Sequence, residues 1–245
     1  MTNKETISPV LLAAILATGL MTFAGVVSET AMNVTFPTLM REFAINTSTV
    51  QWLTTAYLLV LALIIPLSTW LNKNFTTKAL FTTASLIFIT GTLLGAFAPN
   101  YTLLLSGRIL QGAGTGIALP LMFNIILTQA PKTRIGLIMG IASLIVAMAP
   151  AVGPVLAGVV IDRYGWRTIF LILLPVLLVS LALGVTGIKP IRPLAPEKIN
   201  LPDYLLLVIA FSSFIFATEK AAAHGWLSGT VGGLLALAAI ALTLF

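Results

Sequence analysis

Eight apolar runs, each close to the length of a membrane-spanning helix, constrain this chain more than any other feature of its sequence. A helix needs roughly 20 apolar residues to cross the hydrocarbon core of a bilayer. Only 8% of the residues are charged, whereas a soluble domain carries roughly a quarter because its surface must face water. The sequence therefore predicts an all-α polytopic membrane protein with spans near residues 10–36, 48–70, 79–97, 102–128, 135–160, 167–188, 203–222 and 226–245.

The charged and metal-binding residue types argue against several functional classes. The net charge of +6 does not indicate nucleic-acid binding, because the basic residues sit singly between apolar runs and form no patch. The sequence has no Cys and one His, His224, so we expect no disulfide, no metal centre and no cofactor. A membrane-embedded enzyme would need a converging set of nucleophile, base or metal ligands, and no such set converges in this sequence.

Lys and Arg are unequally divided between the two sides of the predicted spans. Basic residues are enriched in cytoplasmic loops, so the more basic side is expected in the cytoplasm. That side holds the N-terminus, and the chain is expected in the cytoplasmic membrane in contact with its lipids. The eight residues on that side are Lys4, Lys73, Lys78, Lys132, Arg134, Lys189, Arg192 and Lys198, and the four on the other are Arg41, Arg163, Arg167 and Lys220.

Two ionisable residues lie well inside predicted spans, Glu29 in the first and Arg108 in the fourth. At 1.5 Å per residue, both lie roughly 10–12 Å below the outer boundary of the bilayer, so a pair is geometrically allowed. One interpretation is a structural ion pair that joins two helices. The other is a transport pathway in which Glu29 exchanges a proton and Arg108 tunes its proton affinity. Arg108 should face the interior with Glu29 as its preferred partner, or otherwise Ser28, Asn33 or Gln51.

Small residues and prolines are concentrated in the fourth and fifth spans. In the fifth, Pro150, Gly153, Pro154 and Gly158 fall within nine residues. Glycine lets helices approach closely and proline bends them. Together with a polar pair, this pattern indicates helices that rock against one another, and ordinary tight packing is the alternative interpretation.

Four ordered motifs identify a family resemblance. They are Thr30, Asn33, Val34 and Pro37 in the first span; Arg108, Gln111, Gly112 and Gly114 in the fourth; Ala151–Pro154 with Gly158 in the fifth; and Gly165–Arg167 with Ile169 and Phe170 at the sixth. These motifs resemble those of the major facilitator superfamily, specifically its fourteen-span drug:proton antiporter branch. The resemblance implies that Arg108 takes part in proton coupling and that the fifth-span motif is that of an antiporter.

The fifth-span motif also implies a neighbour. In the resembled family this motif packs on the second helix, so Gly153 and Gly158 should contact that helix. The fifth helix should bend between Pro150 and Pro154, because each proline removes a backbone hydrogen bond and crowds the preceding turn.

Two departures from the family motifs concern charged positions. The first-span motif usually carries its acid two residues before Thr30, where this chain has Ser28. Glu29 comes one residue later, rotated by about 100° around the helix. The loop between the second and third spans usually has an acid where this chain has Lys73. The usual charge-relay latch of that loop is therefore expected to be missing.

The resemblance implies a three-part organisation. Residues 1–188 are expected to form a six-helix N-terminal bundle of the major-facilitator type, and residues 189–202 a cytoplasmic linker. Residues 203–245 would form two extra linker transmembrane helices, the second cut short by the end of the chain. The missing C-terminal half of the same transporter is then the expected protein partner.

The expected function is proton-coupled export of lipophilic drugs or other small molecules by alternating access. Its partners would be protons and a small lipophilic substrate. Tyr57 and Asn124 are candidate substrate-binding residues in an apolar cavity. Two alternatives stay open: a proton-coupled carrier of a nutrient, metabolite or lipid with the same fold, and a non-transporting membrane partner.

Overall fold

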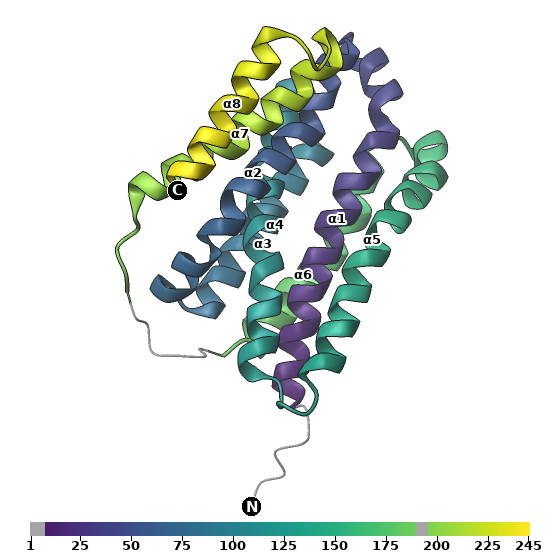
Figure 1. Ribbon diagram of the computed structural model, residues 1–245. Coiled ribbons are helices and arrows are strands. Elements are labelled where there is room, and N and C mark those ends of the chain that lie inside the picture. The colour runs from purple at the N-terminus through teal and green to yellow at the C-terminus, as the bar shows by residue number, and fades with distance from the viewer. Residues whose placement is uncertain (1–7, 190–195) are drawn as a thin grey trace, which may run out of the picture.

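The computed structural model describes residues 8–189 and 196–245, apart from the side chains of residues 222–224. This part of the chain forms eight α-helices and no strand (Figure 1). Seven helices are long and apolar enough to cross a membrane, whereas the last has 16 residues. The predicted all-α polytopic membrane fold is confirmed. The helices are α1 (Pro9–Phe43), α2 (Thr47–Asn74), α3 (Thr77–Ala96), α4 (Tyr101–Gln129), α5 (Ile135–Tyr164), α6 (Arg167–Gly187), α7 (Leu201–His224) and α8 (Gly229–Leu244).

Polar caps fix where α2, α3 and α4 begin. Asn46, Thr76 and Asn100 each accept a hydrogen bond from the backbone N–H three residues later, at 2.8, 3.2 and 2.9 Å. Such a bond satisfies one of the amide groups that the first turn of a helix leaves unpaired. Short polar gaps between apolar runs are therefore enough to end one helix and start the next.

α1 is longer than the sequence predicted, because Pro37 does not end it. The helix continues to Phe43 and closes at Ala44, whose φ of 52° is left-handed. The N–H of Ala44 bonds to the carbonyl of Met40. The extra turns carry Glu42, which belongs to the contacts described below.

The helices approach one another through glycines. In lipid no hydrophobic effect drives helices together, so close backbone approach and interhelical hydrogen bonds matter more. α4 packs on α2 and α3, while α1 packs on α5 and α6. A Cβ atom at Gly112 would lie 2.5 Å from the carbonyl oxygen of Tyr57 on α2, and one at Gly91 on α3 would lie 2.5 Å from that of Gly107. The backbone of α4 therefore lies in close contact with the backbones of both α2 and α3.

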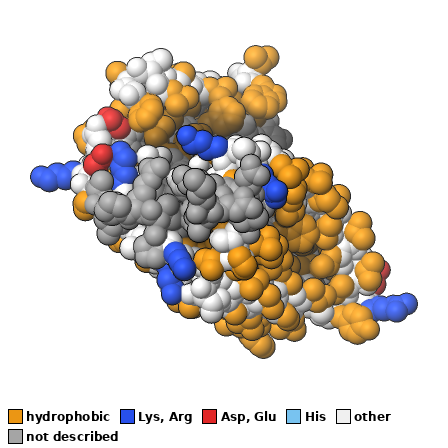
Figure 2. Space-filling view, turned by 90° about the horizontal axis from the view of Figure 1, so that it is seen from below, with side chains coloured by type: hydrophobic (Ala, Val, Ile, Leu, Met, Phe, Trp, Pro, Cys, Tyr) orange, Lys and Arg blue, Asp and Glu red, His pale blue; other side chains and the backbone are white. Residues whose placement is uncertain are grey.

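α7 and α8 pack on each other and reach the other six helices mainly through α2. They lie on the opposite side of α2 from α1 and α5 (Figure 1). Seen from the end that carries the N-terminus, basic side chains are scattered over the surface while hydrophobic ones cover the flanks (Figure 2). This distribution suits an end that faces water and flanks that face lipid.

Candidate functional site

Arg108 is completely buried on α4, seven residues after the helix begins at Tyr101. Its Nε donates to the backbone carbonyl of Leu53 on α2 at 3.2 Å. Its Nη1 donates to the hydroxyl of Ser28 on α1 at 2.9 Å and to Oε1 of Gln111 at 2.7 Å. A charge buried in a membrane protein is costly unless it is paired or hydrogen-bonded. Groups from α1, α2 and α4 together stabilise this one.

Gln111 extends the network to α3. Its Nε2 donates to Oγ1 of Thr92 at 3.0 Å, and the Thr92 hydroxyl donates to the carbonyl of Phe88 at 2.9 Å. The one hydroxyl hydrogen of Thr92 is used on Phe88, so its oxygen can only accept. This fixes the amide of Gln111 with its nitrogen toward α3 and its oxygen toward Arg108.

Tyr57 closes the network on the side of α2. Its ring centroid lies 4.4 Å from Cζ of Arg108, which is a cation–π contact. Its hydroxyl lies 2.8 Å from Oγ1 of Thr115 and 3.1 Å from the carbonyl oxygen of Gly25, and its single hydrogen is shared between these two acceptors. Tyr57 is fully buried. Contact between Tyr57 and a substrate would therefore require the network to open.

The expected ion pair between Glu29 and Arg108 is not formed, and that prediction was wrong. The ion pairs in the described part of the chain are Lys73–Glu197 and Arg167–Glu42. Glu29 is only half-buried, whereas Ser28, the first alternative, bonds to the guanidinium. Consecutive helix residues point about 100° apart, so Ser28 and Glu29 cannot both face α4. Nη2 of Arg108 is buried without a hydrogen-bond partner among the described residues.

α5 packs on α1, so the prediction that it packs on the second helix was also wrong. A Cβ atom at Gly153 would clash with the side chain of Thr30 and lie 2.9 Å from the carbonyl oxygen of Val27. Gly158 has open space around it among the described residues. Five residues rotate a helix by about 140°, which turns Gly158 away from α1. α5 is continuous through Pro150 and Pro154, and the bend stays a prediction.

Of the remaining motif residues, Asn33 and Gly114 lie at contacts between helices, whereas Pro37 bonds within α1. Asn33 accepts a hydrogen bond from the hydroxyl of Thr54 on α2 at 2.9 Å. Pro37 lies inside α1 and its carbonyl accepts from Nε of Arg41 at 3.3 Å. A Cβ atom at Gly114 would lie 2.8 Å from the carbonyl oxygen of a residue on α3. Their positions fit helix packing, and no substrate or proton role follows from these contacts.

Asn124 also joins two helices. Its Nδ2 donates to Oδ1 of Asn72 on α2 at 3.1 Å, and its carbonyl accepts from the hydroxyl of Thr128 at 2.6 Å. The side chain is half-buried. Its proposed substrate contact would compete with the bond to Asn72.

A second cluster, which the sequence did not predict, joins the ends of α1 and α3 to the start of α6. Glu42 forms an ion pair with Arg167 at 2.8 Å and accepts from Nε1 of Trp166 at 2.7 Å. Arg167 also donates to the carbonyl of Ala98 at 2.7 Å and lies 4.2 Å from the Trp166 ring centroid. The Gly-Trp-Arg motif was noted in the sequence, but α1 was predicted to end before Glu42.

An apolar cavity of about 380 Å³ lies between α1, α4 and α5. It is toward the end of the bundle that carries the N-terminus, because its α1 residues come from the first half of that helix. Cavities of roughly 300–1,000 Å³ are typical of small-molecule sites. Its lining includes Leu12, Leu16, Phe23, Met122, Ile141 and Ile145.

Comparisons with known proteins agree on one family. Residues 18–245 match the model of the Major Facilitator Superfamily. The chain is 39% identical over 245 residues to the lincomycin resistance protein LmrB of Listeria innocua, covering 100% of this chain and 51% of that protein. It is 36% identical over 199 residues to a multidrug resistance protein B homolog of Mycobacterium tuberculosis, covering 81% and 37%. It is 27% identical over 199 residues to the riboflavin transporter RibZ of Clostridioides difficile, covering 81% and 44%.

Solved structures share the fold at low sequence identity. The POT family transporter PepTSo matches with a TM-score of 0.67 and 15% identity, covering 97% of this chain and 52% of that one. At this identity the similarity establishes the fold alone. The chain spans about half the length of the curated relatives it matches, as with the 51% of LmrB.

Proposed function

This chain belongs to the major facilitator superfamily, and we propose that it is the N-terminal part of a transporter that exports lipophilic small molecules in exchange for protons. The observation that carries the proposal is the buried Arg108 network beside the half-buried carboxyl of Glu29. Burying a guanidinium that has no ion-pair partner costs free energy in a membrane protein. Helix packing alone does not require such a group, so its presence supports a role in transport.

Glu29 is the proposed proton carrier and Arg108 the group that tunes it. A carboxyl and a guanidinium that lie close together inside a membrane-spanning bundle influence each other's charge state. Because Arg108 is hydrogen-bonded to Ser28 and Gln111 rather than ion-paired, Glu29 is left free to change protonation state. The unpartnered Nη2 of Arg108 supplies a donor for the ionised carboxylate after a side-chain rotation.

The substrate class is supported by the apolar cavity and by two relatives. The cavity between α1, α4 and α5 presents hydrophobic side chains that suit a lipophilic molecule. Relatives covering most of this chain are named for lincomycin resistance and multidrug resistance. A relative named as a riboflavin transporter favours the second candidate, a carrier of a metabolite on the same fold.

The proposed partner is the second half of the same transporter. Along α5, Gly136, Gly140, Pro154 and Gly158 are exposed and present little side-chain bulk. A helix from the other half could approach this face closely. We further propose that α1 to α6 form the N-terminal bundle, that residues 189–202 lie in the cytoplasm with the N-terminus, and that α7 and α8 are the linker helices.

Transport by the full-length protein in proteoliposomes tests the proposal. With an inward-directed proton gradient, lincomycin or ethidium should be extruded and should trigger proton movement, and Arg108→Ala should abolish both. Arg41→Ala, which removes an exposed arginine of α1, is the matched control and should transport normally. Riboflavin transport without drug-dependent proton movement would favour the metabolite carrier instead.

A further inference from the structure

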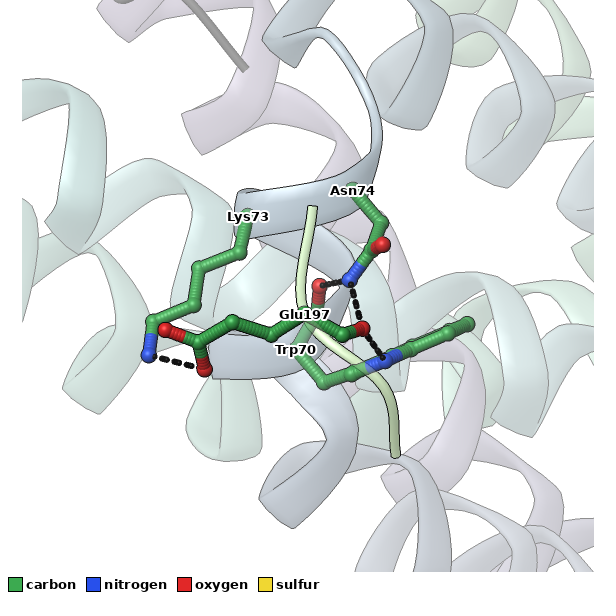
Figure 3. Close-up of polar contacts among 4 residues, drawn as sticks. All are labelled: Trp70, Lys73, Asn74 and Glu197. Carbon is green, nitrogen blue, oxygen red and sulfur yellow. Dashed lines mark hydrogen bonds and ion pairs between the residues drawn. The ribbon is translucent and has the colours of Figure 1, made fainter. Parts of the chain in front are cut away.

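One residue of the linker, Glu197, is held by the C-terminal end of α2 (Figure 3). Nε1 of Trp70 and Nδ2 of Asn74 both donate to the backbone carbonyl of Glu197, at 2.9 and 3.2 Å. Nζ of Lys73 lies 2.6 Å from its carboxylate. Lys73 and Asn74 follow Trp70 by three and four residues, so all three lie on one face of the helix. Both the backbone and the side chain of Glu197 are therefore recognised.

The α2 side chains are arranged for this contact. Nδ2 of Asn74 also donates to the carbonyl of Trp70 at 2.9 Å, which fixes the amide toward the linker. The Trp70 ring packs edge-on against Phe75 with 6.0 Å between centroids. The C-terminal end of a helix carries partial negative charge and repels a carboxylate. Lys73 in the last turn reverses that local charge and makes the position favourable for Glu197.

The attachment continues along α2 beyond the linker. α7 begins at Leu201, four residues after Glu197. The hydroxyl of Tyr204 donates to the carbonyl of Leu63 at 3.3 Å, and Phe216 packs on Trp52 with 5.5 Å between ring centroids. α2 therefore contacts the linker at one end and α7 in its middle and at its other end.

We propose that Trp70, Lys73 and Asn74 form a docking site for the linker with Glu197 as its anchor, and that the docked linker fixes α7 to α2. The pair α7–α8 then moves with α2 as one body. The resembled loop has an acid at the position of Lys73. In this chain the lysine pairs with an acid of the chain's own linker, Glu197, which explains why a basic residue stands there. The proposal concerns how the linker is held, so it does not rest on drug export.

The neutral hydrogen bonds should hold the linker more strongly than the ion pair. The side chains of Lys73 and Glu197 are 42% and 59% exposed, and exposed pairs contribute little and are screened by salt. The two donors on the Glu197 carbonyl do not depend on charge. Loss of the Trp70 donor should therefore have a larger effect than loss of the Lys73 charge, and only the latter effect should disappear at high salt.

One tryptic cleavage site in the linker can report whether the linker is docked. Lys189 and Arg192 are each followed by proline, and trypsin does not cleave before proline. Lys198–Ile199, the bond just after the anchor, is then the cleavable bond in residues 189–202. A docked linker resists cleavage there because the protease must bind an extended, released segment.

The experiment is tryptic cleavage at Lys198 in the purified full-length protein, followed by mass spectrometry. Trp70→Phe keeps the ring and removes the N–H, and it should speed cleavage about fivefold, the equivalent of one hydrogen bond of ~1 kcal/mol. Lys73→Gln should speed it about twofold at low salt and not at 1 M salt. Trp226→Phe, at an exposed tryptophan between α7 and α8, is the control and should cleave like the wild type.

Thermal unfolding of each variant checks that the helices stay folded, and Glu197→Gln gives a second variant that leaves α2 unchanged. It should behave like Lys73→Gln. Equal cleavage rates for wild type, Trp70→Phe and Lys73→Gln would overturn the docking site. An equal acceleration in Trp226→Phe would overturn it as well, because the effect would then not be specific to α2.

Discussion

Arg108 on α4 donates a hydrogen bond to Ser28 on α1 at 2.9 Å, although the carboxyl of Glu29 is the next residue in the chain. The buried guanidinium is thus held by neutral groups from α1, α2 and α4, and one of its nitrogens stays without a partner among the described residues. Two adjacent residues of α1 can therefore have separate roles. Ser28 belongs to the packed network, whereas Glu29 lies at its edge.

Ser28→Ala and Glu29→Gln should separate stability from coupling. Ser28→Ala removes an acceptor from a buried charge, which should lower the stability of the full-length protein by about 1–2 kcal/mol. Glu29→Gln keeps the shape of a half-buried side chain and should leave the melting temperature within about 1 °C, while abolishing drug-dependent proton movement in proteoliposomes. Normal proton movement in Glu29→Gln would exclude this residue as the carrier.

Gly112→Ala should destabilise the protein because its new methyl group would lie 2.5 Å from the carbonyl oxygen of Tyr57. Overpacking of this kind costs about 1–3 kcal/mol, here because α2 must move away from α4. Gly233→Ala on α8 is the matched control, since a Cβ atom there meets nothing within 4 Å. Melting in detergent should fall for Gly112→Ala and hold or rise for Gly233→Ala. The reverse order would contradict the tight α2–α4 contact.

The number and positions of the helices could be predicted because apolar run length relates directly to bilayer thickness. The caps at Asn46, Thr76 and Asn100 kept the boundaries of α2 to α4 close to the apolar runs. The end of α1 was missed, because a proline inside a long helix can be accommodated without ending it. Helix Pro9–Phe43 carries Pro37 and continues past it.

The neighbours of each helix could not be predicted from spacing. Gly153 marks a face with no side chain, but nothing in its sequence context says that α1 rather than α2 covers that face. Thr92 and Thr115 complete the Arg108 network. Each is a single threonine in an apolar span, and no repeating pattern in the sequence shows which neighbouring helix it faces. Ser28 was named only as an alternative to Glu29, because a carboxylate is the stronger partner for a buried guanidinium.

Gly153→Leu and Gly158→Leu should fail in different ways. Gly153 faces Val27 and Thr30 of α1, so a leucine there should force α1 and α5 apart and lower the melting temperature. Gly158 meets open space in the described chain, so the Gly158→Leu protein should fold normally. If α5 presents this face to the second half of the transporter, Gly158→Leu should lower the transport rate at least tenfold with unchanged melting. Full transport by Gly158→Leu would remove the support for that contact.

Thr92→Val should weaken proton coupling although Thr92 touches neither Arg108 nor the cavity. Valine keeps the branched shape of threonine and removes the acceptor for Nε2 of Gln111. The Gln111 amide then loses the bond that keeps its oxygen on Arg108, and a buried amide nitrogen is left unpaired at a cost of about 1–3 kcal/mol.

Thr92→Ser is the matched control, because its hydroxyl can still donate to the carbonyl of Phe88 and accept from Gln111. We expect Thr92→Val to shift the pH dependence of transport, since a reoriented Gln111 changes the field that Arg108 exerts on Glu29, and Thr92→Ser to retain the wild-type profile. A purely structural role would lower the melting temperature of Thr92→Val and the amount of active protein, and would leave the shape of the pH profile unchanged. Identical profiles for wild type, Thr92→Val and Thr92→Ser would therefore place Thr92 outside the coupling network.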